Sequence, residues 1–334
     1  MSWAGLAGFL IGATSATQSR MNGELSARLH EPLYAALWNF VSGWMVLTIV
    51  LLSSRRTRAG LRSLAAEVRE GRMPWWQTLG GVLGGTYVLA VAYAVPLAGV
   101  ALVTIAIVAG QTGSAVIVDR VGLGPAGRAP VTPVRVVAAA VSTAGVGIAV
   151  LGRVVAGNPT GVSNEPAIAV GAAVVLPVVL SLVVGGLHSV QSAINGRVNV
   201  TTDITWATTW LNFTNGLLLL GAVALVRWLT GGLGPLHLEQ PPGWVWFGGL
   251  AGVVFISVAA VIVRRMGVLH TMLVLLCGQV LGALALDVLN PATRHTVTVV
   301  VVSGLVLTAV AAGLPSLLSG SSRRPPTVSG RIDP

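Results

Sequence analysis

The sequence predicts an all-α polytopic membrane protein whose ten transmembrane helices form two inverted five-helix repeats. The first observation behind this prediction is composition, since 54% of the 334 residues are hydrophobic and only 9% are charged. A soluble domain carries charges on about a quarter of its residues, so this chain is expected to reside in a membrane. The second observation is a set of ten apolar runs of roughly 20 residues, the length that an α-helix needs to cross a bilayer. The third is an internal duplication.

Two blocks of the sequence recur without gaps, and polar residues carry the match. The first block recurs at a separation of 173 positions (191 − 18) and the second at 168 positions (242 − 74). Glycine matches mean little in a chain with 42 glycines, but matched Gln, Asn, Trp and Asp in apolar surroundings indicate a duplicated unit. The first block pairs Gln18, Ser19, Asn22, Gly23, Asn39, Phe40 and Gly43 with Gln191, Ser192, Asn195, Gly196, Asn212, Phe213 and Gly216. The second pairs Pro74, Trp76, Gly80, Gly81, Gly84, Gly99, Gly110, Gln111 and Asp119 with Pro242, Trp244, Gly248, Gly249, Gly252, Gly267, Gly278, Gln279 and Asp287.

The apolar runs divide evenly between the two copies. We expect spans at roughly 3–22, 32–53, 75–95, 100–121, 134–154, 170–194, 204–227, 244–263, 268–288 and 296–317. Pro96 and Gly99 suit a tight hairpin between the third and fourth spans, and residues 264–267 separate the eighth from the ninth. Each copy then holds five spans, and an odd number inverts the second copy relative to the first. The repeats are residues 1–155 and 156–318, followed by a tail, 319–334, that we expect to be disordered and cytoplasmic.

The arginines set the orientation of the chain in the membrane. All twenty basic residues are Arg, and they lie in connections between apolar runs rather than on one face. This spread does not indicate nucleic-acid binding, despite a net charge of +10. With the N-terminus inside, only Arg20, Arg28, Arg153, Arg227 and Arg294 fall outside, and the other fifteen are cytoplasmic. This bias predicts an integral protein of the inner (plasma) membrane with both termini in the cytoplasm.

A polar stripe recurs on the first and sixth spans. The stripe consists of Ser15, Gln18, Ser19 and Asn22 on the first span and of His188, Gln191, Ser192 and Asn195 on the sixth. Spacings of three, four and seven residues place these side chains on one helical face. Asn39 and Asn212 lie at matching depths on the following spans. In an inverted pair of repeats these residues form two clusters, one near each membrane surface. We expect them to be a pair of gates or vestibules, or else interhelical hydrogen-bond glue worth ~1 kcal/mol per contact. The candidate gate residues are Gln18, Asn22 and Asn39 at the outer end and Gln191, Asn195 and Asn212 at the inner end.

Glycines spaced four residues apart predict where helices approach closely. Without side chains on one face, two helix backbones can pack in contact. The pairs are Gly8 with Gly12, Gly80 and Gly81 with Gly84 and Gly85, and Gly248 with Gly252.

Three side chains are candidates for holding a substrate. Gln111 and Gln279 sit near the middle of their spans, close to the bilayer midplane, where transporters of inverted design bind substrate. A Gln amide can orient a polar, uncharged group, although a structural role for this pair is the alternative. His188 lies on the same face as Gln191 and either relays protons or is a neutral, hydrogen-bonded core histidine.

Asp119 and Asp287 follow the central glutamines by eight residues, about 12 Å along a helix. That depth is near the hydrocarbon boundary, where a carboxylate is tolerated. A helix-end anchor or structural ion pair is the favoured interpretation, with a coupling role as the alternative. Since no Asp, Glu, Lys or Arg lies at the centre of a span, the expected substrate is uncharged or weakly charged. No catalytic motif occurs, and the single Cys277 allows no cysteine metal site, so neither an enzyme nor a cofactor nor a metal is expected.

The duplicated motif resembles the drug/metabolite transporter superfamily. Gly110-Gln111 with Asp119 eight residues later, the early Gln18-Ser19-x-x-Asn22-Gly23 segment and Asn39 carry this resemblance, together with their second-copy matches. The chain is most similar to the YdcZ-like branch in a fused two-repeat (EamA/DMT-like) form, over about residues 3–317. The resemblance implies ten helices, cytoplasmic termini and a central cavity lined by the first four helices of each repeat. By this analogy the fifth and tenth spans pack outside or mediate a homodimer.

We therefore expect a secondary active transporter, an exporter, that moves a small polar metabolite or drug-like compound by alternating access. Its partners would be this small-molecule substrate and the lipid bilayer, with no nucleic acid and with a homodimer as a further candidate. A passive facilitator or channel is the first alternative. The second is a non-transporting scaffold, which would use the basic connection 53–74 as its partner surface.

Overall fold

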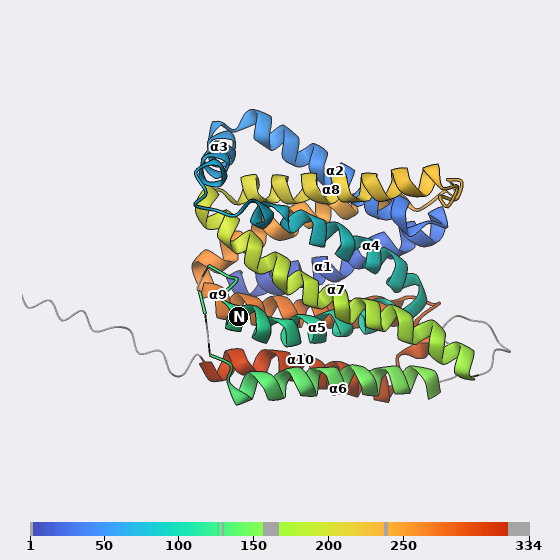
Figure 1. Ribbon diagram of the computed structural model, residues 1–334. Helices are drawn as coiled ribbons and strands as arrows, with labels where there is room; N and C mark the ends of the chain where they lie inside the picture. The colour runs from blue at the N-terminus through green and yellow to red at the C-terminus, as the bar shows by residue number, and fades with distance from the viewer. Residues whose placement is uncertain (1–2, 126, 129, 156–166, 237–239, 320–334) are drawn as a thin grey trace, which may run out of the picture.

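The computed structural model describes residues 3–125, 127–128, 130–155, 167–236 and 240–319. In these ranges every regular element is helical, and the long helices lie alongside one another in a bundle (Figure 1). The expected disordered tail falls almost entirely outside the described residues, as does the junction between the two repeats. The elements are α1 (Trp3–Leu29), α2 (Pro32–Ser53), α3 (Arg55–Arg69), η1 (Trp75–Leu79), α4 (Gly80–Ala98), α5 (Val100–Val121), α6 (Pro133–Val155), α7 (Ala167–Thr202), α8 (Thr205–Leu229), η2 (Gly243–Phe247), α9 (Gly248–Leu289), η3 (Arg294–Thr296) and α10 (Val299–Ser319).

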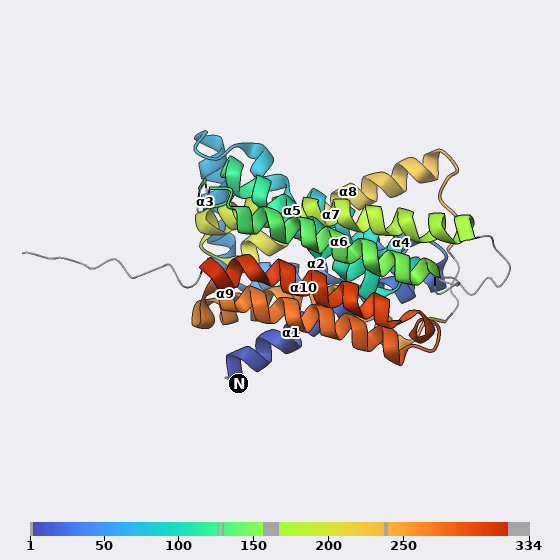
Figure 2. The same ribbon diagram turned by 90° about the horizontal axis from the view of Figure 1, so that it is seen from below.

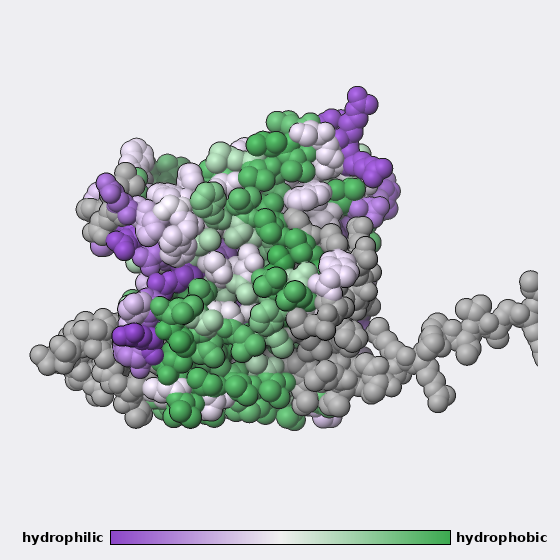
Figure 3. Space-filling model, turned by 180° about the vertical axis from the view of Figure 1, so that it is seen from behind, coloured by the Kyte–Doolittle hydropathy of each residue, from purple (hydrophilic) through white to green (hydrophobic). Residues whose placement is uncertain are grey.

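The bundle has the dimensions and surface of a polytopic membrane protein. Six helical segments in the described ranges are long and apolar enough to cross a bilayer. Figure 3 shows hydrophobic side chains across the middle of the bundle and hydrophilic ones gathered toward its two ends. The six segments are Pro32–Ser53, Trp75–Ala98, Val100–Val121, Pro133–Gly152, Val174–Thr202 and Thr205–Leu229, and shorter apolar stretches are Gly243–Phe255, Val274–Leu289 and Val299–Ala311.

The connection 53–74 is not the loop that the sequence predicts. It contains α3, which begins where the side chain of Ser54 accepts a hydrogen bond from the backbone N–H of Thr57. Leu64 of this helix packs with Met73 and with Val198 of α7. The many arginines led to the interpretation of this segment as a basic connection without regular structure. Its helix is defined instead by the Ser54 cap and by the buried side of α3.

The hairpin expected between the third and fourth spans is present. α4 ends and α5 begins at Gly99, whose φ of +77° is strained for any residue with a side chain. α5 is the innermost helix, because every residue from Val100 to Ala109 is buried.

α9 differs from the prediction of two separated spans, since its backbone is helical throughout Gly248–Leu289. Its contacts with α1 nevertheless reverse direction. Gly248 and Gly252 lie against Asn22 and Gln18, which is an antiparallel order, whereas Gly278 and Gly282 lie against Phe9 and Ala13, which is a parallel order. Both Ile262 and Val274 lie near Gly8. α9 therefore doubles back between these residues, as its orange ribbon shows in Figure 1.

Helices of each half of the chain pack against helices of the other half. The α4–α5 hairpin packs on α7, and the doubled α9 packs on α1. α2 and α8 interlock through Phe40 and Phe213, whose ring centroids are 5.1 Å apart, and each ring fills the space over a glycine of the other helix, Gly216 or Gly43.

α6 and α10 form a pair on one side of the bundle (Figure 2). Ser142 and Thr308 join them, since each hydroxyl donates to the backbone carbonyl of the other residue, over 3.4 and 3.0 Å. Buried residues of both helices, Val146 and Ala149 of α6 and Val301 and Leu305 of α10, pack in the same core cluster as α5.

Candidate functional site

Three helices bring half-buried, uncharged polar side chains together where α4, α5 and α7 meet. The Nε2 atom of Gln111 on α5 lies 2.7 Å from Nδ1 of His188 on α7. The hydroxyl of Ser189 donates to the backbone carbonyl of Gln111 over 2.9 Å. The ring of Tyr87 on α4 stacks at a tilt of 33° over His188, with 5.0 Å between the ring centroids. We call Tyr87, Gln111, His188 and Ser189 the central cluster.

The hydrogen bond between Gln111 and His188 fixes the roles of the ring nitrogens. An amide nitrogen only donates, so Nδ1 of His188 accepts. A neutral ring then carries its proton on Nε2, which remains a donor. Together with the carbonyl oxygen of the Gln111 side chain and the Tyr87 hydroxyl, the cluster offers donors and acceptors but no formal charge.

Two glycines allow α5 and α7 to approach closely enough for this cluster to form. A Cβ atom at Gly110 would overlap the backbone carbonyl of Leu182, and one at Gly185 would overlap that of Ile107. Any side chain at either position would separate the helices and pull His188 out of reach of Gln111.

The structure does not join Gln279 to this cluster. Gln279 is half-buried on α9, and its backbone nitrogen would lie 2.9 Å from a Cβ atom at Gly12 of α1. Among the described residues its side chain has no hydrogen-bond partner. The position that matches His188 in the first copy is Ser15, so the two halves differ in chemistry here.

At one end of the bundle, the predicted outer gate is held by a buried amide pair. Nδ2 of Asn39 donates to Oδ1 of Asn22 over 2.9 Å, and both side chains are at most 3% exposed. Gln18 lies one turn deeper against Gly252, where a Cβ atom would come within 2.8 Å of its Nε2. Its side chain makes no hydrogen bond within the described part of the chain.

The predicted inner gate has a different hydrogen bond. Asn212 accepts from Nε2 of Gln191 over 3.2 Å, and Asn195 instead faces Gly80, where a Cβ atom would lie 2.5 Å from its Oδ1. The Oε1 atom of Gln191 is buried and has no partner in the described ranges. An unsatisfied buried acceptor is unusual, so this end holds a polar group without a fixed partner.

The two aspartates contact different kinds of group. Asp287 is fully buried and accepts from the backbone N–H groups of Val100 and Ala101, over 3.1 and 2.9 Å. It thereby caps the N-terminus of α5 from the end of α9. Asp119 is about one third exposed and forms an ion pair with Arg135 at 2.7 Å. Both sets of contacts are those of helix anchors.

The sequence prediction missed two members of the central cluster. Ser189 directly follows His188 but lies off the heptad-like stripe, and its partner is a backbone carbonyl that no side-chain pattern reveals. Tyr87 matches Phe255 in the second copy (255 − 168), so it has no polar counterpart. The available signal was its hydroxyl in a mostly apolar helix, and Thr86 and Tyr93 of the same helix share that signal.

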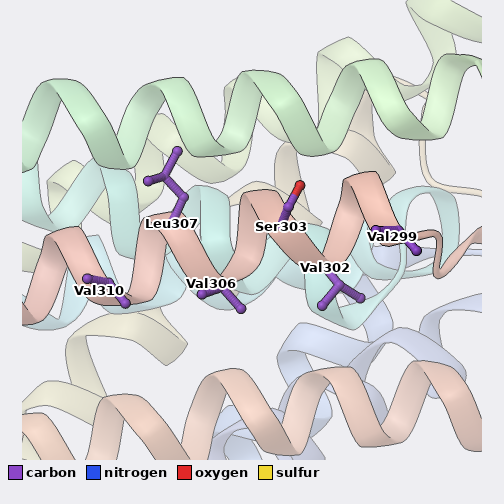
Figure 4. Close-up of a pocket in the computed structure, with 6 residues that line it drawn as sticks. All are labelled: Val299, Val302, Ser303, Val306, Leu307 and Val310. Atoms are coloured by element: carbon purple, nitrogen blue, oxygen red, sulfur yellow. The ribbon is translucent and has the colours of Figure 1, made fainter.

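A groove of about 430 Å³ lies on the outer helix α10 (Figure 4). Ser303 is its polar member, and its hydroxyl donates to Val300 of the same helix. In Figure 4, Ser303 and Leu307 point toward α6 and the valines 302, 306 and 310 point away from it. Lipid acyl chains suit such an apolar surface, which lacks groups to orient a polar substrate. Its lining residues are Val299, Val302, Ser303, Val306, Leu307 and Val310.

Comparison with known families decides the classification. The chain matches the family described as "Putative inner membrane exporter, YdcZ" over residues 3–148 and 176–314, which together are most of its length. The chain belongs to the YdcZ family. This confirms the resemblance drawn from the repeated motif, and each matched stretch lies within one of the two expected repeats. No match was found among curated proteins or among solved structures. This YdcZ-family chain is an integral membrane protein of a family described as exporters.

Proposed function

We propose that this YdcZ-family chain is a secondary active transporter that exports a small polar, uncharged or weakly charged compound by alternating access. The observation that carries the proposal is that each half packs against the first helix of the other half. Gly84 of the first half lies against Gln191 of α7, and at the matched place Gly252 of the second half lies against Gln18 of α1. Equivalent interfaces of this kind can exchange open and closed states, which is how paired repeats alternate access.

The directions of the helices support an inverted arrangement of two five-helix repeats. α1 and α7 are the matched first helices, and in Figure 1 they run in opposite directions along the bundle. The doubled α9 supplies two segments at the place where the first half has α4 and α5. The basic helix α3 and the N-terminus lie at the same end of the bundle (Figure 1), and we assign this end to the cytoplasm because of its arginines.

The substrate site in this proposal is the central cluster with Gln279. Gln111 and His188 present amide and imidazole groups without a charge, which favours a polar, uncharged or weakly charged ligand. The amide of Gln279 has no partner in the described ranges and is therefore free to contact a bound molecule.

The gates in this proposal are the two amide clusters. Asn22 with Asn39 closes the outer end, and Gln191 with Asn212 closes the inner end. A passive facilitator would need polar groups along the whole path, whereas each stripe here occupies only its own end. This distribution favours alternating occlusion over a continuous channel.

The proposal is tested by finding a ligand and measuring its transport. A thermal-shift screen of uncharged metabolites on the purified protein identifies a ligand, since binding stabilises the folded state. Uptake of that ligand into proteoliposomes should saturate, and Gln111→Ala should reduce it about tenfold or more, the effect of losing a polar contact of ~1.4 kcal/mol. The matched control is Thr112→Val, because among the described residues the partner of the Thr112 hydroxyl is the carbonyl of Val108 on its own helix. Equal uptake by both variants would refute the assignment of the site.

A further inference from the structure

A row of arginines without acidic partners lies on the outward face of α3. Arg55, Arg62 and Arg69 recur at a spacing of seven, which aligns them along one side of a helix. All three are exposed, as is Arg56 on the flank. None of these four forms an ion pair with any residue that the structure describes. We call Arg55, Arg56, Arg62 and Arg69 the basic face.

The opposite side of α3 fixes the helix to the protein. Thr57, Gly60 and Leu64 are buried, and a Cβ atom at Gly60 would lie 2.9 Å from the backbone carbonyl of Thr202 on α7. In Figures 1 and 2, α3 lies crosswise to the long helices at one end of the bundle. The helix therefore lies parallel to the membrane plane, with its basic face turned away from the protein.

Two tryptophans place this part of the chain at the depth of the lipid headgroups. Trp75 and Trp76 follow α3 and are 66% and 42% exposed. Exposed Trp side chains of membrane proteins concentrate at the boundary between hydrocarbon and water. The basic face is thus held next to the layer in which phospholipid phosphates lie.

Arg72 provides an internal contrast. It follows α3 but pairs with Glu67 at 2.7 Å and also contacts Glu70. The hydrogen bond from Arg72 holds the pKa of Glu67 below its ordinary value. The charge of Arg72 is therefore balanced by neighbouring carboxylates, whereas the basic face has no acidic partner among the residues that the structure describes.

We propose that the basic face of α3 binds the headgroups of anionic phospholipids in the adjoining leaflet. A guanidinium group donates two parallel hydrogen bonds to a phosphate, and basic residues near a membrane surface are attracted by anionic lipids. This site is separate from the central cluster and stands whether or not the transported compound is identified. With such a site, α3 would anchor this end of the protein to the membrane more strongly when the leaflet contains more anionic lipid.

The test measures lipid binding by the full-length protein in a neutral detergent. The protein is titrated with fluorescent phosphatidylglycerol or, for comparison, with fluorescent phosphatidylcholine. We expect preferential binding of phosphatidylglycerol that weakens with salt. Arg62→Gln should weaken it about fivefold, the usual effect of one interfacial charge, and combining Arg55→Gln, Arg62→Gln and Arg69→Gln should abolish the preference. Gln sustains a helix well, and an unchanged unfolding midpoint in phosphatidylcholine shows that the variants fold.

The control is Arg72→Gln, which changes the net charge of the protein by the same amount as Arg62→Gln. The proposal requires Arg72→Gln to alter phosphatidylglycerol affinity less than twofold. Equal losses in the two variants, or equal affinity for the two lipids, would overturn it. Displacement of phosphatidylglycerol by a soluble polyglutamate peptide at equal charge concentration would also overturn it, because the occupant would then be an acidic protein.

Discussion

The Gln111 amide donates to Nδ1 of His188 across 2.7 Å, and this bond joins α5 of the first half to α7 of the second. The matched positions in the other half, Gln279 and Ser15, have no such bond in the described ranges. The repeat in the sequence is therefore not accompanied by a repeat of this hydrogen bond. A site that differs between the two matched positions can orient an asymmetric ligand.

Formation of the central cluster should depend on the close approach of α5 and α7. Gly110→Ala places a methyl group onto the carbonyl of Leu182, so we expect it to lower the free energy of unfolding by about 1–3 kcal/mol and to abolish ligand binding. Gly113→Ala on the same helix meets nothing within 4 Å and should be neutral or slightly stabilising. Unfolding in detergent and ligand titration measure both effects. Equal behaviour of the two variants would contradict the packing argument.

His188 should act as a neutral hydrogen-bonding residue. His188→Gln retains a polar group of similar length, so we expect weaker ligand binding with the pH dependence of uptake unchanged. Uptake measured over a series of external pH values checks this. Disappearance of a pH dependence that the unmodified protein has would instead identify His188 as a proton relay.

Asp287 should stabilise the junction of the two halves. Asp287→Ala leaves two backbone N–H groups of α5 without an acceptor, and the expected loss is about 3 kcal/mol in the free energy of unfolding. Asp119→Ala removes a partly exposed ion pair and should lose less than about 1 kcal/mol. If Asp287→Ala kept its full stability but lost transport, the carboxylate would be a coupling group rather than an anchor.

The inner gate should depend on a side chain that contributes little to stability. Gln191→Met removes an acceptor that has no partner in the described ranges and one hydrogen bond to Asn212, which is only half-buried and can be hydrated, so a loss below about 1 kcal/mol is expected. Asn39→Leu leaves the buried Oδ1 of Asn22 without its donor and should lose about 1–3 kcal/mol. Uptake should fail in Gln191→Met although the protein stays folded. A folded Gln191→Met variant with normal uptake would remove Gln191 from the gate.

The sequence predicted the pairs that duplication preserves. Gly80 with Gly84 and Gly248 with Gly252 were expected to allow close packing, and each faces a polar residue of the other half. The sequence also predicted the break at Gly99, where the tight hairpin joins α4 to α5. These features follow from local composition and from the repeat.

The features that the sequence missed depend on tertiary packing. α3 was taken for a loop because its arginines outnumber the apolar residues on its buried face. Asn212 bonds to Gln191, whereas its matched residue Asn39 bonds to Asn22, and the repeat in the sequence does not predict this difference. Ser189 reaches a backbone carbonyl of another helix, and no spacing along the chain predicts such a partner.

The inverted relation of the two halves can be measured without knowledge of the substrate. The exposed Cys277 is first replaced by Ser, and single cysteines are then introduced by Ser63→Cys or Gln240→Cys, which lie in the matching connections of the two halves. A membrane-impermeant maleimide is applied to intact cells and to inverted vesicles. We expect position 240 to be labelled in intact cells and position 63 in inverted vesicles. Labelling of both positions from the same side would contradict the inversion and, with it, the transport mechanism proposed here.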